Sequence, residues 1–221
     1  KSTLFGAIAG TFLPDTGSVI LDGRDITRLP DYKRSKHIGR LFQDPLKGTA
    51  PGMTIEENLA LAYMRASAHT SPFSMITKAD RAEFRDRLAT LGLGLEKRMR
   101  QPVGLLSGGQ RQALTLLMAT LVTPQLLLLD EHTAALDPAT AEKVLQLTKT
   151  IVSTHGITCL MITHNIPSAL SLGNRTIMMN AGKIVLELSG KARKEMTAED
   201  LLQAFHDQSA ISDRMLFSAG C

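Results

Sequence analysis

The stretch Leu126-Leu127-Leu128-Leu129-Asp130-Glu131 decides the fold of this sequence. Four consecutive leucines bounded by turn residues predict a strand that is buried on both faces, as in a parallel sheet. Two carboxylates follow at the end of this strand, which is where ligands bind in open parallel sheets. They indicate either a Mg²⁺-linked anion site, in which one acid holds the metal and the other orients a water, or an acidic strand end that caps the next helix.

The segments on either side of this strand alternate between strand and helix patterns. Apolar runs predict further strands at 37–43 and 157–163, and the second is expected to be buried as well. The remaining patterns predict helices at 4–10, 107–122, 138–153, 166–172 and 197–205, and hairpins at 17–23 and 175–188. This order predicts an α/β protein with a parallel sheet, helices on both of its faces and additional antiparallel β elements.

Residues 54–102 interrupt this alternation with helical patterns. Thr54 with Glu57, and Thr77 with Asp80, have the spacing of helix-capping boxes. We expect residues 54–102 to be wholly helical. We also expect a helical subdomain over approximately residues 54–122, inserted into a single domain that covers residues 1–221.

The composition is that of a packed globular domain. The sequence has 221 residues, of which 43% are hydrophobic and 21% charged, and its apolar runs are far shorter than the roughly 20 residues of a spanning helix. Two cysteines are too few for a disulfide framework, and Cys159 is expected to be a buried free thiol in a reducing compartment.

The charge of the sequence argues against a nucleic-acid surface. The net charge is +4, aromatic residues make up 4% of the chain and there is no Trp, whereas such surfaces combine dense basic stripes with aromatic residues. Small basic clusters occur at 33–36, 97–100 and 191–194. We interpret them as solvated surface, and the third as a solvated linker.

Two short motifs have the properties of phosphate-binding segments. Lys1-Ser2-Thr3 precedes a predicted helix, as at the end of a phosphate-binding loop, but three residues alone are common by chance. Ser107-Gly108-Gly109-Gln110 opens another helix, where glycines leave backbone N–H groups accessible to an anion and Ser107 can cap the helix.

Together these motifs resemble the ATP-binding cassette (ABC) ATPase family over residues 1–190. The resemblance rests on five strings in the family's order and at ordinary intervals, together with His164: Lys1-Ser2-Thr3, Gln43, Leu106-Ser107-Gly108-Gly109-Gln110, Leu126 to Glu131, and Ala135-Leu136-Asp137. It implies a P-loop NTPase-like fold with a parallel sheet core, antiparallel β elements and an inserted helical subdomain. It further implies ATP and Mg²⁺ as the ligands.

The resemblance also implies which residues hold the nucleotide and the metal. Lys1, Ser2 and Thr3 match the end of the Walker A loop, which binds the phosphates and Mg²⁺. Gln43 matches the Q-loop glutamine, which touches Mg²⁺ or the attacking water. Asp130 matches the Walker B aspartate, so that Ser2, Gln43 and Asp130 are the implied metal ligands.

A second set of residues is implied in hydrolysis and dimer formation. Glu131 matches the catalytic base that polarises water, and His164 matches the switch histidine at the γ-phosphate. Ser107, Gly108, Gly109 and Gln110 match the signature motif, which contacts the γ-phosphate held by the opposite subunit. Asp137 matches the D-loop aspartate at the dimer seam. ATP then joins two chains, and its hydrolysis separates them.

The sequence departs from the family pattern in three places. His132 stands where Pro is common and is expected to loosen the turn, and Ala134 replaces a common D-loop Ser. The glycine-rich start of Walker A and the adenine-stacking aromatic residue are expected to lie upstream of Lys1. We therefore expect residues 1–221 alone to bind ATP poorly and to lack the ATPase activity of the full-length product.

The resemblance points to the ATPase of a bacterial importer for a small organic solute such as an amino acid. The implied partners are a second copy of the chain, a transmembrane permease and a solute-binding protein, with no nucleic acid, and the implied location is the cytoplasmic face of the membrane. Two alternatives remain: the ATPase of an exporter or lipoprotein-release complex, and a soluble cassette protein that acts on ribosomes or DNA.

Overall fold

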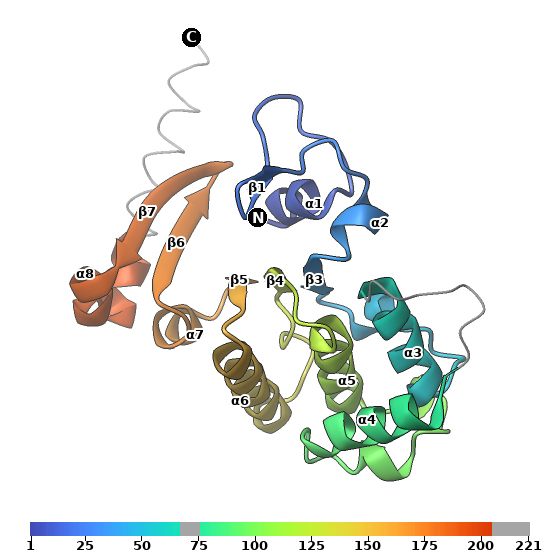
Figure 1. Ribbon diagram of the computed structural model, residues 1–221. Helices are drawn as coiled ribbons and strands as arrows, with labels where there is room; N and C mark the ends of the chain where they lie inside the picture. The colour runs from blue at the N-terminus through green and yellow to red at the C-terminus, as the bar shows by residue number, and fades with distance from the viewer. Residues whose placement is uncertain (67–75, 205–221) are drawn as a thin grey trace. The chain divides into compact units, whose positions relative to one another are not determined.

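The computed structural model describes residues 1–66 and 76–204 (Figure 1). The chain forms two compact units, of which the larger runs from Ser2 to Ile162 and the smaller contains Lys1 and the chain from Thr163 onward. In the described chain, no helix is long and apolar enough to cross a membrane.

The larger unit combines helices with a short hairpin and a sheet. Its helices and strands are α1 (Ser2–Ala9), β1 (Ile20–Leu21), β2 (Arg24–Asp25), α2 (Asp31–Arg34), β3 (Ile38–Leu41), α3 (Ile55–Ala66), α4 (Lys78–Ala89), α5 (Gly108–Thr120), β4 (Leu126–Asp130), α6 (Pro138–His155) and β5 (Thr158–Ile162). Three short 3₁₀ helices are η1 (Pro45–Gly48), η2 (Leu95–Lys97) and η3 (Val103–Leu105).

The predicted parallel sheet is confirmed, with β4 between β3 and β5. Leu129 of β4 is paired with Leu41 of β3 and with Met161 of β5. All four leucines of β4 are buried, as the continuous apolar run predicted. The prediction that β5 is equally buried is wrong: among the described residues β5 is an edge strand, and Leu160 is 37% exposed.

Helices cover both faces of this sheet, as predicted (Figure 1). On one face, Phe5 of α1 packs with a core that includes Leu126 and Leu128. On the other face, Leu116 of α5 and side chains of α6 pack with Leu127 and Leu129. Because alternate leucines of β4 point to opposite faces, this single strand holds both helical layers.

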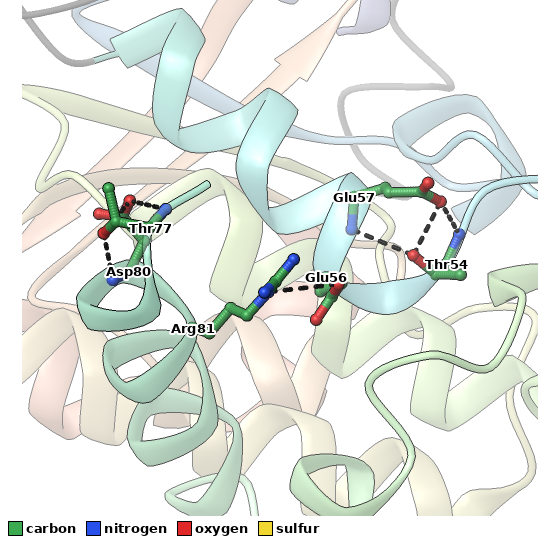
Figure 2. Close-up of polar contacts among 6 residues, drawn as sticks. All are labelled: Thr54, Glu56, Glu57, Thr77, Asp80 and Arg81. Atoms are coloured by element: carbon green, nitrogen blue, oxygen red, sulfur yellow. Dashed lines mark hydrogen bonds and ion pairs between the residues drawn. The ribbon is translucent and has the colours of Figure 1, made fainter. Parts of the chain in front are cut away.

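Helices α3, α4 and α5 share a second apolar core. It contains Leu59, Phe84 and Leu114, each almost completely buried. Both predicted capping boxes form: the Thr54 backbone N–H donates to Glu57, and that of Thr77 donates to Asp80 (Figure 2). Figure 2 also shows Arg81 of α4 beside Glu56 of α3, at an N–O distance of 3.6 Å.

The prediction that residues 54–102 are wholly helical is wrong for the part after α4. After α4 the chain turns through Gly92 and Gly94, which have φ of 65° and 69°, values that favour glycine and end a helix. The following segment contains only the short η2 and then returns to pair Pro102 with Thr54. Residues 67–75 of the predicted helical region lie outside the described residues.

The smaller unit contains the predicted hairpin. Its elements are α7 (Ile166–Ser171), β6 (Arg175–Asn180), β7 (Lys183–Ser189) and α8 (Gly190–Glu195). β6 and β7 pair antiparallel around a turn in which Ala181 and Gly182 have positive φ. Residues 198–204 are helical, and Phe205, the predicted end of this helix, lies outside the described residues.

Two basic residues that were interpreted as solvated surface instead bind backbone carbonyls. Arg193 lies in α8 and donates to the carbonyls of Leu172 and Ala169, so residues 191–194 are not a linker. Arg34, in the larger unit, is only 1% exposed, and burial lowers the pKa of its guanidinium. A guanidinium has five N–H donors, which suits it to clusters of carbonyl oxygens.

Arg34 binds the carboxyl-terminal end of α1. Its Nη1 donates to the carbonyls of Ala7 and Ile8 at 2.7 and 2.8 Å. Its Nε and Nη2 donate to the carbonyls of Leu29 and Thr27 at 2.8 and 2.6 Å. Because the last carbonyls of a helix lack partners within the helix, this single side chain fixes α1 to the segment that follows the hairpin.

We expect Arg34→Met to lower the free energy of unfolding by about 3 kcal/mol, because four partly buried carbonyls lose the hydrogen bonds that Arg34 donates. Urea unfolding followed by circular dichroism measures the change. Arg85→Met, at an exposed position of α4, is the control and should change stability by less than about 0.5 kcal/mol. Equal effects of the two substitutions would contradict this account of Arg34.

Candidate functional site

The amino-terminal end of α1 meets the carboxyl end of β4. Ser2 is the first residue of α1 and Asp130 is the last residue of β4. The Ser2 hydroxyl Oγ donates to Asp130 Oδ1 at 3.4 Å. A helix amino terminus has free N–H groups and a positive potential, so this position suits an anion next to a carboxylate-bound cation.

The carboxyl end of β3 brings a second pair of predicted site residues together. Leu41 of β3 is paired with Leu129 of β4. Gln43 lies two residues after Leu41, and Glu131 lies two residues after Leu129. Gln43 Nε2 donates to Glu131 Oε2 at 3.4 Å. The sheet register therefore places the predicted Q-loop amide beside the predicted catalytic carboxylate.

Glu131 has an unusual backbone conformation. Its φ of 45° lies in the left-handed region, which side chains other than glycine rarely adopt. Its N–H donates to the carbonyl of Ile162 in β5 at 3.1 Å, and its carbonyl accepts from the N–H of Ala134 at 3.0 Å. Such strained residues persist where their surroundings fix them, and they concentrate at functional sites.

The oxygen atoms at this edge suit Mg²⁺. Ser2 Oγ and the Asp130 carboxylate lie together, and Gln43 retains its Oε1 as an acceptor while Nε2 contacts Glu131. In the described part of the chain, no group of three or more His, Cys, Asp or Glu side chains could hold a metal. One carboxylate and a hydroxyl suit a magnesium ion that takes its remaining ligands from phosphates and water.

The predicted signature motif forms the start of α5. Ser107 Oγ accepts from the Gln110 N–H at 3.2 Å, and the Gln110 side chain accepts from the Ser107 N–H at 3.2 Å. Both residues are exposed or half-buried. This reciprocal capping box fixes the backbone of the motif before any ligand binds.

The two signature glycines lie against the segment that follows Glu131. A Cβ at Gly108 would meet Leu136 Cδ2 at 3.3 Å, and a Cβ at Gly109 would collide with the methyl group of Thr140. Asp137, the predicted D-loop residue, is the N-cap of α6 and accepts from the Thr140 N–H at 3.0 Å. Hydrogen bonds from the Thr140 side chain and then from its backbone N–H lower the pKa of the Asp137 carboxyl.

The remaining predicted site residues are not brought to this edge by a described contact. Thr3 is an exposed residue of α1. Lys1 and His164 belong to the smaller unit, and in the sequence His164 comes after β5 and before α7. The functional roles of all these residues stay predictions.

His132 is a feature that sequence reasoning misjudged. The expectation that it loosens the turn is wrong: the side chain is 2% exposed, and its Nε2 lies 3.2 Å from Thr148 Oγ1 on α6. Burial lowers the pKa of His132 to about 4. No local sequence pattern predicts this contact, because its two residues are sixteen positions apart.

Cys159 behaves as the apolar thiol that its surroundings predicted, although it is half-buried rather than fully buried. Burial raises its pKa to about 12. A thiol of this kind is a poor nucleophile.

Comparisons with known proteins found a matching family model, several relatives and a similar solved structure. Residues 1–134 match the family model described as ABC transporter. A tyrosine transport ATP-binding protein of Clostridioides difficile is 43% identical over 93% of this chain and 81% of its own length. A methionine import protein of Rhizobium johnstonii is 34% identical, and a putrescine transport protein of Escherichia coli is 35% identical.

The match with the methionine import protein covers 85% of this chain but only 49% of that relative. The match with the putrescine transport protein covers 84% of this chain but only 46% of that relative. Among solved structures, an ATP-binding cassette in a dimeric post-hydrolysis state with ADP and Pi matches with a TM-score of 0.71 at 29% identity. That match covers 85% of this chain and 79% of the other.

We expect Gly109→Ala to destabilise the larger unit by about 2 kcal/mol, because the new Cβ collides with Thr140 in a packed region. Adding Thr140→Ser removes the methyl group that collides and should restore at least half of the lost free energy of unfolding. Urea unfolding of the single and double variants measures both changes.

The matched control is Gly108→Ala, whose Cβ would meet only the end of the flexible Leu136 side chain. Its effect on unfolding should be less than half that of Gly109→Ala. If Thr140→Ser gives no recovery in the Gly109→Ala background, the contact between the signature helix and α6 is not the cause.

Proposed function

This chain belongs to the ABC transporter family, and we propose that it is the ATP-hydrolysing subunit of a bacterial importer for a small organic solute such as an amino acid. The observation that carries the proposal is the pairing of Ser2 with Asp130 and of Gln43 with Glu131 at one sheet edge. This edge offers separate groups for a metal, a phosphate chain and a water.

The first pair binds the nucleotide. Ser2, Asp130 and the Gln43 amide oxygen would hold Mg²⁺, which supplies positive charge to the phosphate oxygens when it is bound. Lys1 and the hydroxyl of Thr3 bind the phosphates together with the free N–H groups at the start of α1. These groups favour the transition state because its charge is spread over the phosphoryl oxygens.

The second pair activates the water. Glu131 accepts a hydrogen bond from the attacking water and polarises it, while Gln43 holds the Glu131 carboxylate in place through Nε2. His164 donates to the γ-phosphate as charge develops. The chemistry needs little movement of these groups, because phosphoryl transfer depends mainly on positioning and electrostatics.

The signature motif completes the site of a second copy of the chain. Ser107 and the N–H groups of Gly108 and Gly109 form a preorganised anion site at the start of α5. We infer that this site binds the γ-phosphate held by the partner, with Asp137 at the seam between the two chains. The solved relative is itself dimeric, which supports this arrangement.

The identity of the cargo rests on the relatives. The tyrosine transport protein matches over most of both chains, whereas the methionine and putrescine proteins match over about half of their own length. We infer that this subunit sits on the cytoplasmic face of the membrane, bound to a transmembrane permease that a solute-binding protein supplies with an amino acid, with no nucleic-acid partner.

We expect Glu131→Gln in the gene product that carries this sequence to lower kcat for ATP hydrolysis by about 100-fold or more, because the water loses its polarising carboxylate. ATP binding should remain, so the variant accumulates as an ATP-bound dimer in size-exclusion chromatography with light scattering. Glu83→Gln, at an exposed position of α4, is the control and should hydrolyse ATP like the wild type.

The same pair of variants tests the transport role in cells. A strain without the gene should take up labelled tyrosine slowly, and the wild type and Glu83→Gln should restore uptake while Glu131→Gln does not. Wild-type turnover by Glu131→Gln would remove this residue from the mechanism. Uptake that is independent of the gene would remove tyrosine as the cargo.

A further inference from the structure

We propose that His132 is a positioning residue for hydrolysis, which holds the backbone of Glu131 in its left-handed conformation by hydrogen bonding to Thr148 on α6. The proposal rests on the role of Glu131 proposed above. It assigns a function to the buried His132 side chain, which is not one of the groups proposed above to bind the nucleotide or to activate the water.

The geometry of the contact gives it a direction. Thr148 Oγ1 donates to the carbonyl of Val144 within α6 at 2.8 Å. The Thr148 hydroxyl has one hydrogen, and when that hydrogen bonds to Val144 the oxygen accepts from His132 Nε2, which lies 3.2 Å away. In this arrangement the His132 ring carries its hydrogen on Nε2 and donates it to Thr148.

Burial makes this hydrogen bond hard to exchange for water. His132 and Thr148 are 2% and 7% exposed. A buried polar group that loses its partner keeps the full cost of desolvation, so the pair favours the conformation in which both groups are satisfied. The residue directly after Glu131 is in this way attached to the middle of α6.

Glu131 needs such an attachment because its φ of 45° is unfavourable for a residue with a side chain. Two backbone hydrogen bonds hold it, one from its N–H to Ile162 and one to its carbonyl from Ala134. The first bond joins Glu131 to β5, and the second lies within the turn. The bond from His132 to Thr148 adds a constraint that connects the turn to α6.

Helix α6 also contacts the signature segment. Thr140, in the first turn of α6, lies against Gly109, and Asp137 caps the same turn. The water-activating turn and the signature helix are therefore attached to one helix. A loss of the His132 contact should disturb the position of the Glu131 carboxylate while leaving the proposed metal-holding groups at Ser2 and Asp130 unchanged.

The test compares steady-state ATP hydrolysis by variants of the gene product that carries this sequence. Thr148→Val keeps the shape of the side chain and removes the hydroxyl that accepts from His132, and His132→Leu removes the donor. We expect each to lower kcat at least about fivefold, with KM for ATP within about twofold of the wild type, because misplacement of a catalytic group affects the chemical step.

Two further variants separate positioning from stability. Thr148→Ser keeps the hydroxyl and should retain most of the wild-type kcat. Thr120→Val removes another buried hydroxyl, which donates to the Leu116 carbonyl within α5 at 2.8 Å. It should lower the melting temperature about as much as Thr148→Val and leave kcat per folded molecule unchanged.

Wild-type kcat in Thr148→Val would overturn the proposal, and so would an equal loss of kcat in Thr120→Val. If His132→Leu does not fold, Thr148→Val still decides the question, because it leaves the imidazole in place. The Glu131→Gln variant separates the two proposals: if it is inactive while Thr148→Val is fully active, only the role of His132 fails.

Discussion

The burial of β4 between two parallel neighbours is the constraint on which the site depends. Its leucines alternate between the core under α1 and the core under α5 and α6, so a shift of one residue would exchange the two faces. In the same register, β3 and β4 end side by side, which places Gln43 beside Glu131. Packing of Phe5 against this strand brings the start of α1, and with it Ser2, to Asp130.

Several contacts also fix the segment from Glu131 to Thr140 in place. The left-handed Glu131, the buried His132 and the capping residue Asp137 give this short stretch fixed positions on β5 and α6. Close approach at Gly108 and Gly109 packs the signature helix against the same stretch. The groups that we propose to act on the nucleotide of one chain and of its partner are therefore built on a common support, which suits a device that couples hydrolysis to the closing and opening of a dimer.

Local signals in the sequence predicted the features that depend on neighbouring residues. The leucine run, the capping boxes at Thr54 and Thr77 and the order of strands and helices all follow from periodicity and short-range chemistry. Sequence reasoning failed where a contact joins distant residues. In the sequence, Arg34 is one charge of a basic cluster, but its side chain binds carbonyls of α1 that lie 26 and 27 residues away. The exposure of β5 and the hydrogen bond from His132 to Thr148 were missed for the same reason, because both depend on residues that are distant in the sequence.

We propose that the nucleotide site of this chain serves a membrane permease. The most direct measurement is affinity purification of the tagged gene product from its own membranes in mild detergent, followed by mass spectrometry of the proteins that accompany it. The account predicts a permease with several membrane spans, together with a solute-binding protein of the same system. Recovery of ribosomal or DNA-associated proteins without any permease would contradict it.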